Sequence, residues 1–327
     1  MNVLVCGGAG YIGSNMTALL AATGHEPVVF DNLSKGHRAA VRDARLVEGD
    51  LADYDHVVDT LRRFSIEAVM HFAALIEAGE SVKSPLSFYR NNFCNTENLL
   101  RAMAEVGIER LVFSSTAAVY GVPHHIPITE NDPAEPINPY GDSKRAVERM
   151  CHHQSLTGKL HCAALRYFNA CGAGVNNTRG EDHRPESHLI PLVIQAAMGR
   201  REDVKVFGTD YPTPDGTCVR DYIHIEDLCR AHLLALDRLN DHRELLYNLG
   251  NGTCYSVRQV IDTVRRVSGR QFKVTEAPRR PGDSPFLTAD STKARDELGW
   301  TPKIADLAKI VESAWTWHKN HPDGYQD

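Results

Sequence analysis

The stretch that decides the fold lies near the start of the chain, where residues 3–13 read VLVCGGAGYIG. An apolar run is followed by glycines and then by an amphipathic stretch, which indicates a strand, a turn and a helix in that order. Gly8, Gly10 and Gly13 fit the spacing G-x-G-x-x-G, and Gly7, Gly10 and Gly13 fit the wider G-x-x-G-x-x-G. Glycine lets the backbone approach a pyrophosphate closely, and the start of the helix offers it free N–H groups. The stretch therefore predicts a dinucleotide site.

Short apolar runs alternate with amphipathic stretches through the first half of the chain. We expect strands at residues 3–6, 27–30, 44–47, 68–72, 110–113 and 162–166, and helices at 11–23, 54–64, 87–106 and 140–155. Nearly continuous apolar runs are typical of strands buried on both faces of a parallel sheet. Gly24, Gly107 and Gly158 stand where three of these helices should stop. The pattern predicts an α/β fold with a doubly wound parallel sheet that binds ligands at the carboxyl ends of its strands.

This rhythm changes after residue 169, which predicts a second, smaller α/β domain. We expect loops at residues 171–187 and 208–217, and helices at 189–198, from an N-cap at Ser256 to residue 267, and at 305–319. The predicted division is a dinucleotide-binding Rossmann domain at 1–169 and a substrate-binding domain at 170–327. Part of 219–250 is expected to return to the first domain.

Composition and charge exclude several classes of protein. The 327 residues carry 36 basic and 42 acidic side chains, a net charge of −6, so a general nucleic-acid role is not expected. No apolar run approaches the ~18 residues that a membrane span needs. The N-terminus lacks the basic segment of a signal peptide. We therefore expect a cytoplasmic protein that has no membrane partner.

The cysteines and histidines form no recognisable metal motif. The eight cysteines include no Cys-x-x-Cys pair, and we expect free thiols in a reducing cytosol. The sixteen histidines include no His-x-x-x-His spacing. His152 and His153 are interpreted as helix-surface residues, and His183 and His188 as loop residues. The sequence therefore predicts no metal site.

An acidic residue ends the second predicted strand. Asp31 lies eighteen residues after Gly13, close to the spacing of a carboxylate that binds the ribose of a dinucleotide. Such a carboxylate accepts a hydrogen bond from a free 2′-hydroxyl and repels a 2′-phosphate, so NAD is favoured over NADP. Lys35 and Arg38 are interpreted as loop surface. Asp50 and Leu51 follow the third strand and are expected to contact the adenine.

A tyrosine and a lysine stand four positions apart at the start of a predicted helix. This spacing puts Tyr140 and Lys144 on the same helix face. Free tyrosine has a pKa of about 10, but a neighbouring ammonium group and a cationic nicotinamide ring would favour the phenolate. Thr116 follows another strand and is expected to place its hydroxyl in the same crevice. The three side chains predict base catalysis on a hydroxyl group.

Together these motifs resemble the UDP-glucose 4-epimerase family within the extended short-chain dehydrogenase/reductase superfamily. The resemblance extends along essentially the whole chain through the stretches HFAA at 71–74, GES at 79–81, NN at 91–92, LRYFN at 165–169, GTDYPT at 208–213, DGT at 215–217, VRDYIH at 219–224, YNLG at 247–250 and RRPGD at 279–283. Residues 208–224 are the most specific part, because the generic dehydrogenase fold does not require them.

The resemblance implies a role for many residues. Tyr140 would be the base, Lys144 its tuner and the anchor of the nicotinamide ribose, and Thr116 the hydroxyl partner. NAD would be bound by Gly7, Gly10, Tyr11, Ile12, Gly13, Asp31, Asn32, Asp50, Leu51, Phe72, Ala73, Ala74, Asn91 and Lys144. The UDP-hexose would be bound by Thr116, Tyr140, Tyr167, Phe168, Asn169, His188, Leu189, Phe207, Arg220, Tyr222, Arg280, Asp283 and Leu287. Paired guanidinium groups also suit a diphosphate on chemical grounds. The resemblance further implies a homodimer built on helices 87–106 and 140–155.

Four positions depart from what relatives carry. Thr116 stands where many have serine, Ile76 where some have a lysine near the cofactor phosphates, and His188 where some have asparagine. Leu287 stands at the position that gates the substituent on the sugar's C2 atom. Leucine there is shorter than the tyrosine of some relatives, which predicts a side activity on UDP-N-acetylhexosamines.

The reaction that the resemblance implies is the interconversion of UDP-glucose and UDP-galactose through a transient 4-keto sugar, with NAD recycled. One alternative is a 4,6-dehydratase or a decarboxylase, which needs a further acid beside the hydroxyl residue, where this chain has Ala117 and Ala118. A second alternative is an epimerase that prefers a UDP-N-acetylhexosamine or a UDP-pentose. A third is a noncatalytic NAD sensor, which would be expected to lack Tyr140 or Lys144.

Overall fold

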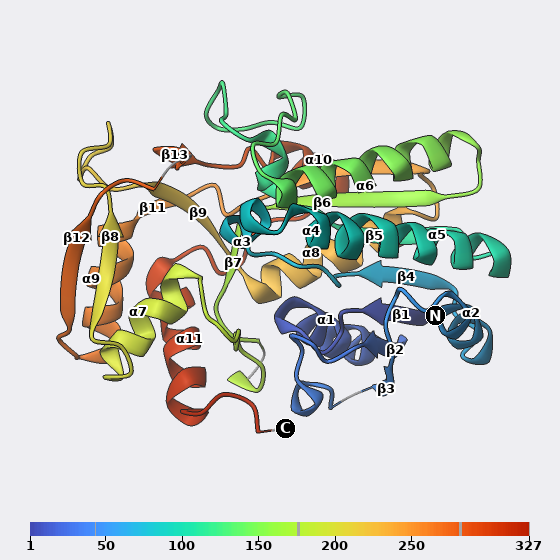
Figure 1. Cartoon of the computed structure of the whole chain (residues 1–327), viewed down its shortest axis with the longest axis horizontal. Coiled ribbons are helices and arrows are strands. Elements are labelled where there is room, and N and C mark those ends of the chain that lie inside the picture. Colours follow the sequence, from blue (N-terminus) through green and yellow to red (C-terminus); the bar gives the residue numbers. More distant parts are fainter. Residues whose placement is uncertain (43, 175–176, 281–282, 327) are drawn as a thin grey trace.

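A parallel sheet of seven strands, in the order β10-β6-β5-β4-β1-β2-β3, forms the centre of the fold (Figure 1). The computed structural model describes residues 1–42, 44–174, 177–280 and 283–326. The strands of this sheet are β1 (Asn2–Cys6), β2 (Glu26–Asp31), β3 (Arg45–Glu48), β4 (Ala68–His71), β5 (Arg110–Ser114), β6 (His161–Tyr167) and β10 (Glu244–Leu249). Six of the seven correspond to the strands expected from the apolar runs. The predicted fold class is confirmed.

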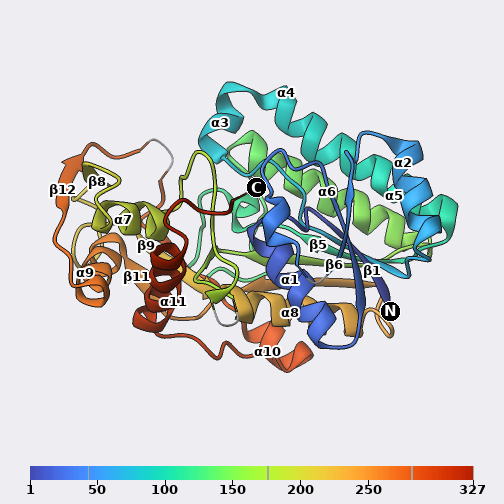
Figure 2. The same ribbon diagram turned by 90° about the horizontal axis from the view of Figure 1, so that it is seen from below.

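Helices cover both faces of this sheet (Figures 1 and 2). One face carries α1 (Tyr11–Ala22), α8 (Ile225–Arg238) and α10 (Thr292–Leu298), and the other carries α2 (Tyr54–Arg63), α5 (Asn95–Val106) and α6 (Pro139–Leu156). Successive strand residues alternate between the two cores: Val3 and Val5 pack with the first set of helices, and Leu4 and Cys6 with the second. Fully burying an aliphatic side chain contributes roughly 1.5–3 kcal/mol. Burial on both sides is why β1 is continuously apolar.

The helix expected at 87–106 is interrupted. It is divided into α4 (Pro85–Phe88), a π-helical turn (Tyr89–Cys94) and α5, and α3 (Ala78–Lys83) precedes it. The side-chain amide of Asn92 in the wide turn binds both backbone groups of Leu75, with N···O distances of 2.8 and 3.0 Å. Asn92 is buried, so these tertiary hydrogen bonds explain why the wide turn is stable there. Short 3₁₀ turns also form at Arg38–Ala40 and Ala117–Tyr120.

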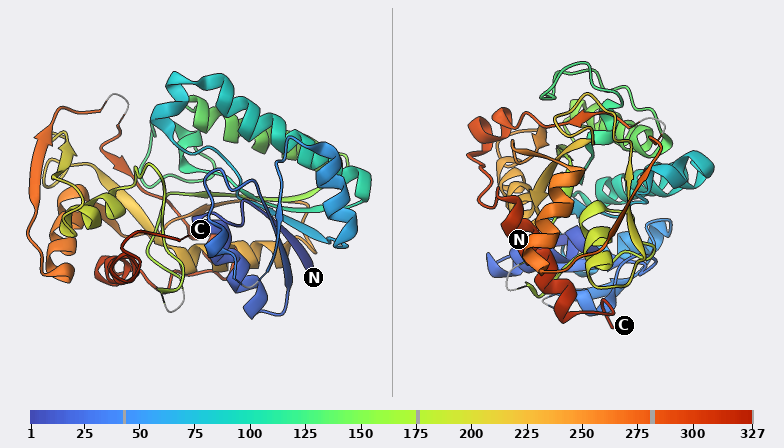
Figure 3. Two further views of the ribbon diagram at one scale, coloured as in Figure 1. Left: turned by 60° about the horizontal axis from the view of Figure 1, so that its bottom comes forward. Right: turned by 90° about the vertical axis from the view of Figure 1, so that its left-hand side faces the viewer.

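A smaller α/β layer lies beyond one end of the large sheet (Figure 3). Its strands are β7 (Asn169–Cys171), β8 (Asp203–Phe207), β9 (Val219–His224), β11 (Cys254–Ser256), β12 (Lys273–Ala277) and β13 (Phe286–Leu287), and its helices are α7 (Leu189–Ala197), α9 (Val257–Ser268) and α11 (Leu307–Asn320). The predicted N-cap at Ser256 is confirmed, because its hydroxyl accepts the N–H of Gln259 at 3.1 Å. The short strands and α8 were not expected from the sequence.

The chain returns to the large sheet after leaving it. Both α8 and β10 belong to the larger layer, although they follow β7, β8 and β9 in sequence. Part of 219–250 was expected to return in this way. The division at residue 169 itself stays a prediction.

The order of strands reverses between β1 and β4, which lie side by side. In open α/β sheets the loops that leave the carboxyl ends of two such strands diverge and open a crevice. The glycine turn follows β1, and the HFAA stretch ends β4, so both reach this crevice. Within the described part of the chain, no helix is long and apolar enough to cross a membrane.

Candidate active site

A cavity of about 330 Å³ opens at the carboxyl ends of the large sheet. Its walls come from the segments that follow β1, β2, β3, β4, β5 and β6, together with the start of α6. Every residue expected to hold the cofactor lines this cavity: Gly7, Gly10, Tyr11, Ile12, Gly13, Asp31, Asn32, Asp50, Leu51, Phe72, Ala73, Ala74, Asn91 and Lys144. Thr116, Tyr140, Tyr167, Phe168, Asn169 and His188 of the predicted substrate site line it as well.

The glycine turn packs backbone against backbone. A Cβ atom on Gly7, whose φ is +77°, would lie 2.5 Å from the amide nitrogen of Ala73, and a Cβ on Gly13 would lie 2.2 Å from the carbonyl oxygen of Gly7. Such distances are far below contact, so both positions need glycine. Gly10 precedes α1 and has no side-chain hydrogen bond that caps the helix. The N–H groups of the first turn are therefore available to an anion in the cavity.

Asp31 braces this turn. Its carboxylate accepts the N–H of Ala9 and the N–H of Leu33, each at 2.9 Å. Burial raises the pKa of Asp31, and the two backbone hydrogen bonds oppose this rise. The side chain lines the cavity, so the same carboxylate supports the turn and faces the site where a ribose is expected.

Two cationic side chains near Asp31, Arg38 and Lys35, differ in whether they line the cavity. Arg38 pairs with Glu48, and both side chains are exposed, which agrees with its interpretation as surface. Lys35 is also exposed on its loop, as it was interpreted, but it lines the cavity as well and forms an ion pair with Glu77 at 2.9 Å. Ile76 lines the same cavity, and Lys35 thus supplies a cation to a wall where Ile76 offers none.

Thr116, Tyr140 and Lys144 all line this cavity. Thr116 caps the 3₁₀ turn that follows β5, where its Oγ1 accepts the N–H of Ala118 at 3.1 Å. A Cβ on Gly141 would lie 2.5 Å from the carbonyl oxygen of Ala118, so α6 presses directly against this turn. That close approach brings the side chain of Tyr140 to Thr116.

The charges of this trio are set mainly by burial. Burial raises the pKa of Tyr140, its hydrogen bond with Thr116 lowers it, and the charge of Glu77 raises it further. Burial also lowers the pKa of Lys144 to about 7, and Glu148 opposes this effect. The ammonium of Lys144 donates to the carbonyl oxygen of Ser114 at 2.8 Å. In the protein alone, burial therefore outweighs the expected effect of Lys144 on the phenolate.

A buried ion pair between Glu148 and Arg166 lies next to these residues in the fold. Glu148, one helical turn after Lys144, accepts hydrogen bonds from Arg166 at 2.6 and 2.8 Å and from Ser115 at 2.6 Å. Arg166 also donates to the hydroxyl of Tyr120 at 2.9 Å. A bidentate pair of this kind fixes α6 against β5 and β6. The sequence reasoning missed Glu148, although its spacing from Lys144 on one helix face was visible.

A second cavity of about 310 Å³ adjoins the first. Asn169, Ala170, Glu181 and His188 line both. The second contains the remaining predicted substrate residues Leu189, Phe207, Arg220, Tyr222, Arg280 and Asp283. Arg280 stacks over the ring of Phe207, with its guanidinium carbon 3.9 Å from the ring centre. Arg201 also lines this cavity and was missed, so three guanidinium groups surround it.

Leu287 lies elsewhere. It pairs with Arg220 in the register of β13 and β9 and packs, like Phe168, on the apolar cluster of Val119, Tyr120 and Ile128. Leu287 is not among the described residues that line the two cavities, although Phe168 lines the first. Its gating role stays a prediction.

Known proteins resemble this chain along its full length. UDP-glucose 4-epimerase of Halalkalibacterium halodurans is 50% identical to it over 327 residues, which cover 99% of this chain and 98% of that protein. The structure of UDP-glucose 4-epimerase from Brucella ovis in complex with NAD matches with a TM-score of 0.94 and 46% identity, covering 97% of this chain and 98% of that one. The UDP-Glc/GlcNAc 4-epimerase of Campylobacter jejuni matches with a TM-score of 0.86 and 42% identity, covering 98% and 99%.

A family model places these similarities in one group. The model of the NAD dependent epimerase/dehydratase family matches residues 3–250, which include the glycine turn, Thr116, Tyr140 and Lys144. The resemblance seen in the sequence motifs is confirmed by these matches. This chain therefore belongs to the NAD dependent epimerase/dehydratase family.

Proposed function

We propose that this protein interconverts UDP-glucose and UDP-galactose and uses NAD as a recycled cofactor. One observation carries the proposal: Tyr140, Thr116 and Lys144 line the same cavity as the glycine turn, and the adjoining second cavity is lined by three arginines. A catalytic hydroxyl between a dinucleotide and an anion-binding pocket suits redox chemistry on a nucleotide sugar. The names of the full-length relatives support the same activity.

The residues of the first cavity fit NAD. The backbone of Gly7 and Gly13 leaves room for a pyrophosphate at the start of α1. The Asp31 carboxylate would accept a hydrogen bond from the adenosine 2′-hydroxyl and repel a phosphate at that position. Bound NAD⁺ would supply hydride transfer, since it would take up a hydride from C4 of the sugar and the NADH so formed would return it, and it would bring a positive charge to the cavity that Tyr140 lines.

The second cavity would hold the substrate by its UDP end. Arg220 and Arg280 are proposed to bind the diphosphate, with Asn169 at the junction of the two cavities. Arg220 is already oriented by hydrogen bonds to the carbonyl oxygens of Ser284 at 2.8 Å and Val219 at 3.0 Å. A substrate anchored at its nucleotide leaves the hexose ring free to turn.

Tyr140 would act as the base. Its phenolate takes the proton of the 4-hydroxyl while that carbon is oxidised, and Thr116 holds the reacting oxygen by a hydrogen bond. The 4-keto sugar then turns over in the cavity, and Tyr140 returns the proton as reduction occurs on the opposite face. Burial alone raises the pKa of Tyr140, so the positive charges of the bound cofactor and of Lys144 are needed to favour the phenolate.

Two rival activities are not favoured by the residues around Thr116. A dehydratase or decarboxylase needs a further proton-transfer group there, and Ala117 and Ala118 lack one. A noncatalytic NAD sensor has no need of a tyrosine, threonine and lysine assembled around the reacting atom.

We also propose a weaker activity on UDP-N-acetylhexosamines. The Campylobacter jejuni relative is named for both UDP-Glc and UDP-GlcNAc. Leu287 packs on the same apolar cluster as Phe168, which lines the first cavity, so the size of Leu287 would act on the sugar through this cluster.

A cytoplasmic homodimer is the proposed form of the protein. Leu86 on α4 and Leu156 at the end of α6 are 81% and 68% exposed. Apolar side chains at these positions would be covered if α5 and α6 packed against a second copy. The eight cysteines are free thiols, as suits a reducing compartment.

Replacing the base gives the direct test of this function. We expect the wild type to convert UDP-galactose to UDP-glucose without accumulating NADH, and Tyr140→Phe to lower kcat by about 10²–10⁴-fold. Product formation followed by chromatography, with absorbance at the NADH band recorded in parallel, measures both. NADH growing in step with turnover would point to a dehydrogenase, and near-normal turnover by Tyr140→Phe would remove Tyr140 from the mechanism.

We expect the buried Lys144 to lower the free energy of unfolding, although catalysis requires it. Its pKa is about 7 in the folded chain and about 10.4 when unfolded. Between these pH values the unfolded chain binds more protons, so this cost shrinks as pH rises. Without nucleotide, the Lys144→Met variant should therefore unfold at a higher denaturant concentration than the wild type at pH 7, and this difference should be smaller at pH 10. With NAD added, the variant should have lost activity. If the difference in unfolding midpoint between the variant and the wild type did not change with pH, it would contradict the lowered pKa of Lys144.

We expect the protein to act on both kinds of UDP-sugar, with a higher kcat/KM for the UDP-hexose. With Leu287 in place, UDP-N-acetylgalactosamine should be epimerised with a lower kcat/KM than UDP-galactose. In Leu287→Tyr the N-acetyl activity should fall by at least about tenfold, the loss that roughly 1–3 kcal/mol of steric discrimination produces, while the hexose activity is retained. Equal losses on both substrates would identify Leu287 as a packing residue only.

A further inference from the structure

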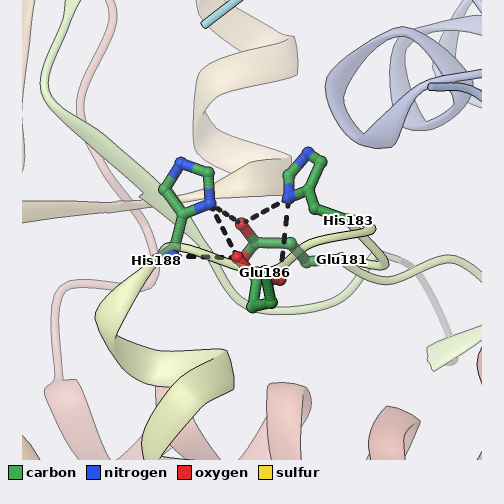
Figure 4. A group of neighbouring side chains, drawn as sticks. All are labelled: Glu181, His183, Glu186 and His188. Atoms are coloured by element: carbon green, nitrogen blue, oxygen red, sulfur yellow. Dashed lines mark hydrogen bonds and ion pairs between the residues drawn. The ribbon is translucent and has the colours of Figure 1, made fainter. Parts of the chain in front are cut away.

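Four side chains with metal-binding chemistry gather on one loop. Glu181, His183, Glu186 and His188 lie on the loop that leads into α7, and one ligand atom from each lies within 4.8 Å of the others. Figure 4 shows both imidazole rings on the same side of the two carboxylates, each with its Nδ1 atom directed at them. The group is part of the wall between the two cavities, because Glu181 and His188 line both of them.

The spacing of these atoms matches a coordination shell. The Nδ1 atom of His188 lies 2.8 Å from Glu181 and 3.0 Å from Glu186, and that of His183 lies 3.3 and 3.6 Å from the same carboxylates. Zn²⁺ binds nitrogen and oxygen ligands at about 2.0–2.1 Å, which separates the corners of a tetrahedron by about 3.3–3.4 Å. The four separations bracket this length. Only small movements of the side chains would be needed to surround an ion.

The burial and the charge of the two glutamates also indicate a bound cation. The carboxylates of Glu181 and Glu186 are only 5% and 4% exposed, and two buried negative charges side by side need compensation. The buried Nδ1 atom of His183 faces both of them without the geometry of a hydrogen bond. Glu186 is held in place, because it accepts the N–H groups of Ser187 at 2.7 Å and His188 at 2.8 Å. Such backbone hydrogen bonds are typical supports of a metal-ligating carboxylate.

We propose that Glu181, His183, Glu186 and His188 bind one divalent transition-metal ion, with Zn²⁺ as the best match. Two imidazole nitrogens exclude the all-oxygen shells that Ca²⁺ and Mg²⁺ prefer, and two carboxylates neutralise the charge of a dication. All four ligands come from one short loop, so the ion would fix that loop as the wall between the two cavities. The site adds a metal to a protein whose proposed function does not require one, and it replaces the sequence-based prediction that there is none.

The competing arrangement has no metal. Burial lowers the pKa of His183, but the neighbouring carboxylates of Glu181 and Glu186 raise it to about 9. Two protonated imidazoles could then balance the two carboxylates as ion pairs. A metal ion would have to displace those protons, so the two arrangements are exclusive and can be told apart by direct measurement of binding.

The first test measures metal binding by the full chain with its nucleotide bound. Protein freed of metal with a chelator is titrated with Zn²⁺ in competition with a chromophoric chelator. We expect one equivalent of Zn²⁺ per chain, and an affinity at least about 100-fold weaker in His183→Ala and in Glu186→Gln, because losing a metal ligand costs more than losing a residue that only supports one. His125→Ala is the matched control, because His125 pairs with Asp132 at 3.2 Å and is 80% exposed. Absence of a bound equivalent, or equal affinity in all four proteins, would overturn the proposal.

The second test measures a new spectroscopic signal and does not depend on a loss of metal affinity. His183→Cys replaces one imidazole by a thiolate, which gives bound Co²⁺ a sulfur-to-cobalt charge-transfer band in the near ultraviolet. We expect this band in His183→Cys and not in the wild type or in His125→Cys, which controls for the other thiols. Co²⁺ binding to folded His183→Cys without the band would place the metal elsewhere and refute this ligand set.

Discussion

The close contact between the glycine turn and the end of β4 is the constraint on which the site depends. Glycine is needed for it at two positions: a side chain on Gly7 would overlap the backbone of Ala73, and one on Gly13 would overlap Gly7 itself. The contact lies where the strand order reverses, so it forms one wall of the crevice that the sheet topology opens. Asp31 holds the same turn from the β2 side through the N–H of Ala9. The glycine turn and the Asp31 carboxylate, which are proposed to bind the cofactor, thus pack together at this crevice.

The proposed catalytic residues Thr116, Tyr140 and Lys144 show how burial affects the charge of a side chain. Burying Tyr140 and Lys144 raises the pKa of the tyrosine and lowers that of the lysine, so burial opposes the charged form of each. A base that is neutral in the protein alone becomes active only when positive charge arrives beside it. Binding of the cofactor would therefore switch on the base, and free enzyme would not carry a reactive phenolate. The Glu148–Arg166 pair keeps the geometry fixed while these charges change.

The sequence predicted the large sheet and the first cavity well, for a physical reason. Strands buried on both faces are continuously apolar, and the glycine spacing reflects backbone contacts that no other residue permits. The strands β7 and β13 could not be found, because two or three residues show no periodicity. The π-helical turn depends on hydrogen bonds from Asn92 to a distant loop. The spacing of Glu181, His183, Glu186 and His188 fits no helix or strand, so only the conformation of the loop brings their ligand atoms together.

The central claim is that hydride leaves C4 of the sugar and returns to the same carbon inside one cavity. A mixture of two substrates tests this claim directly: UDP-glucose deuterated at C4, and UDP-glucose without deuterium that carries an isotope label on its uracil. Mass spectrometry of the UDP-galactose formed then shows which nucleotide carries the deuterium. We predict that the deuterium stays at C4 and stays with its original nucleotide through the turnover. Loss of deuterium to solvent, or its transfer to the other nucleotide, would contradict the account.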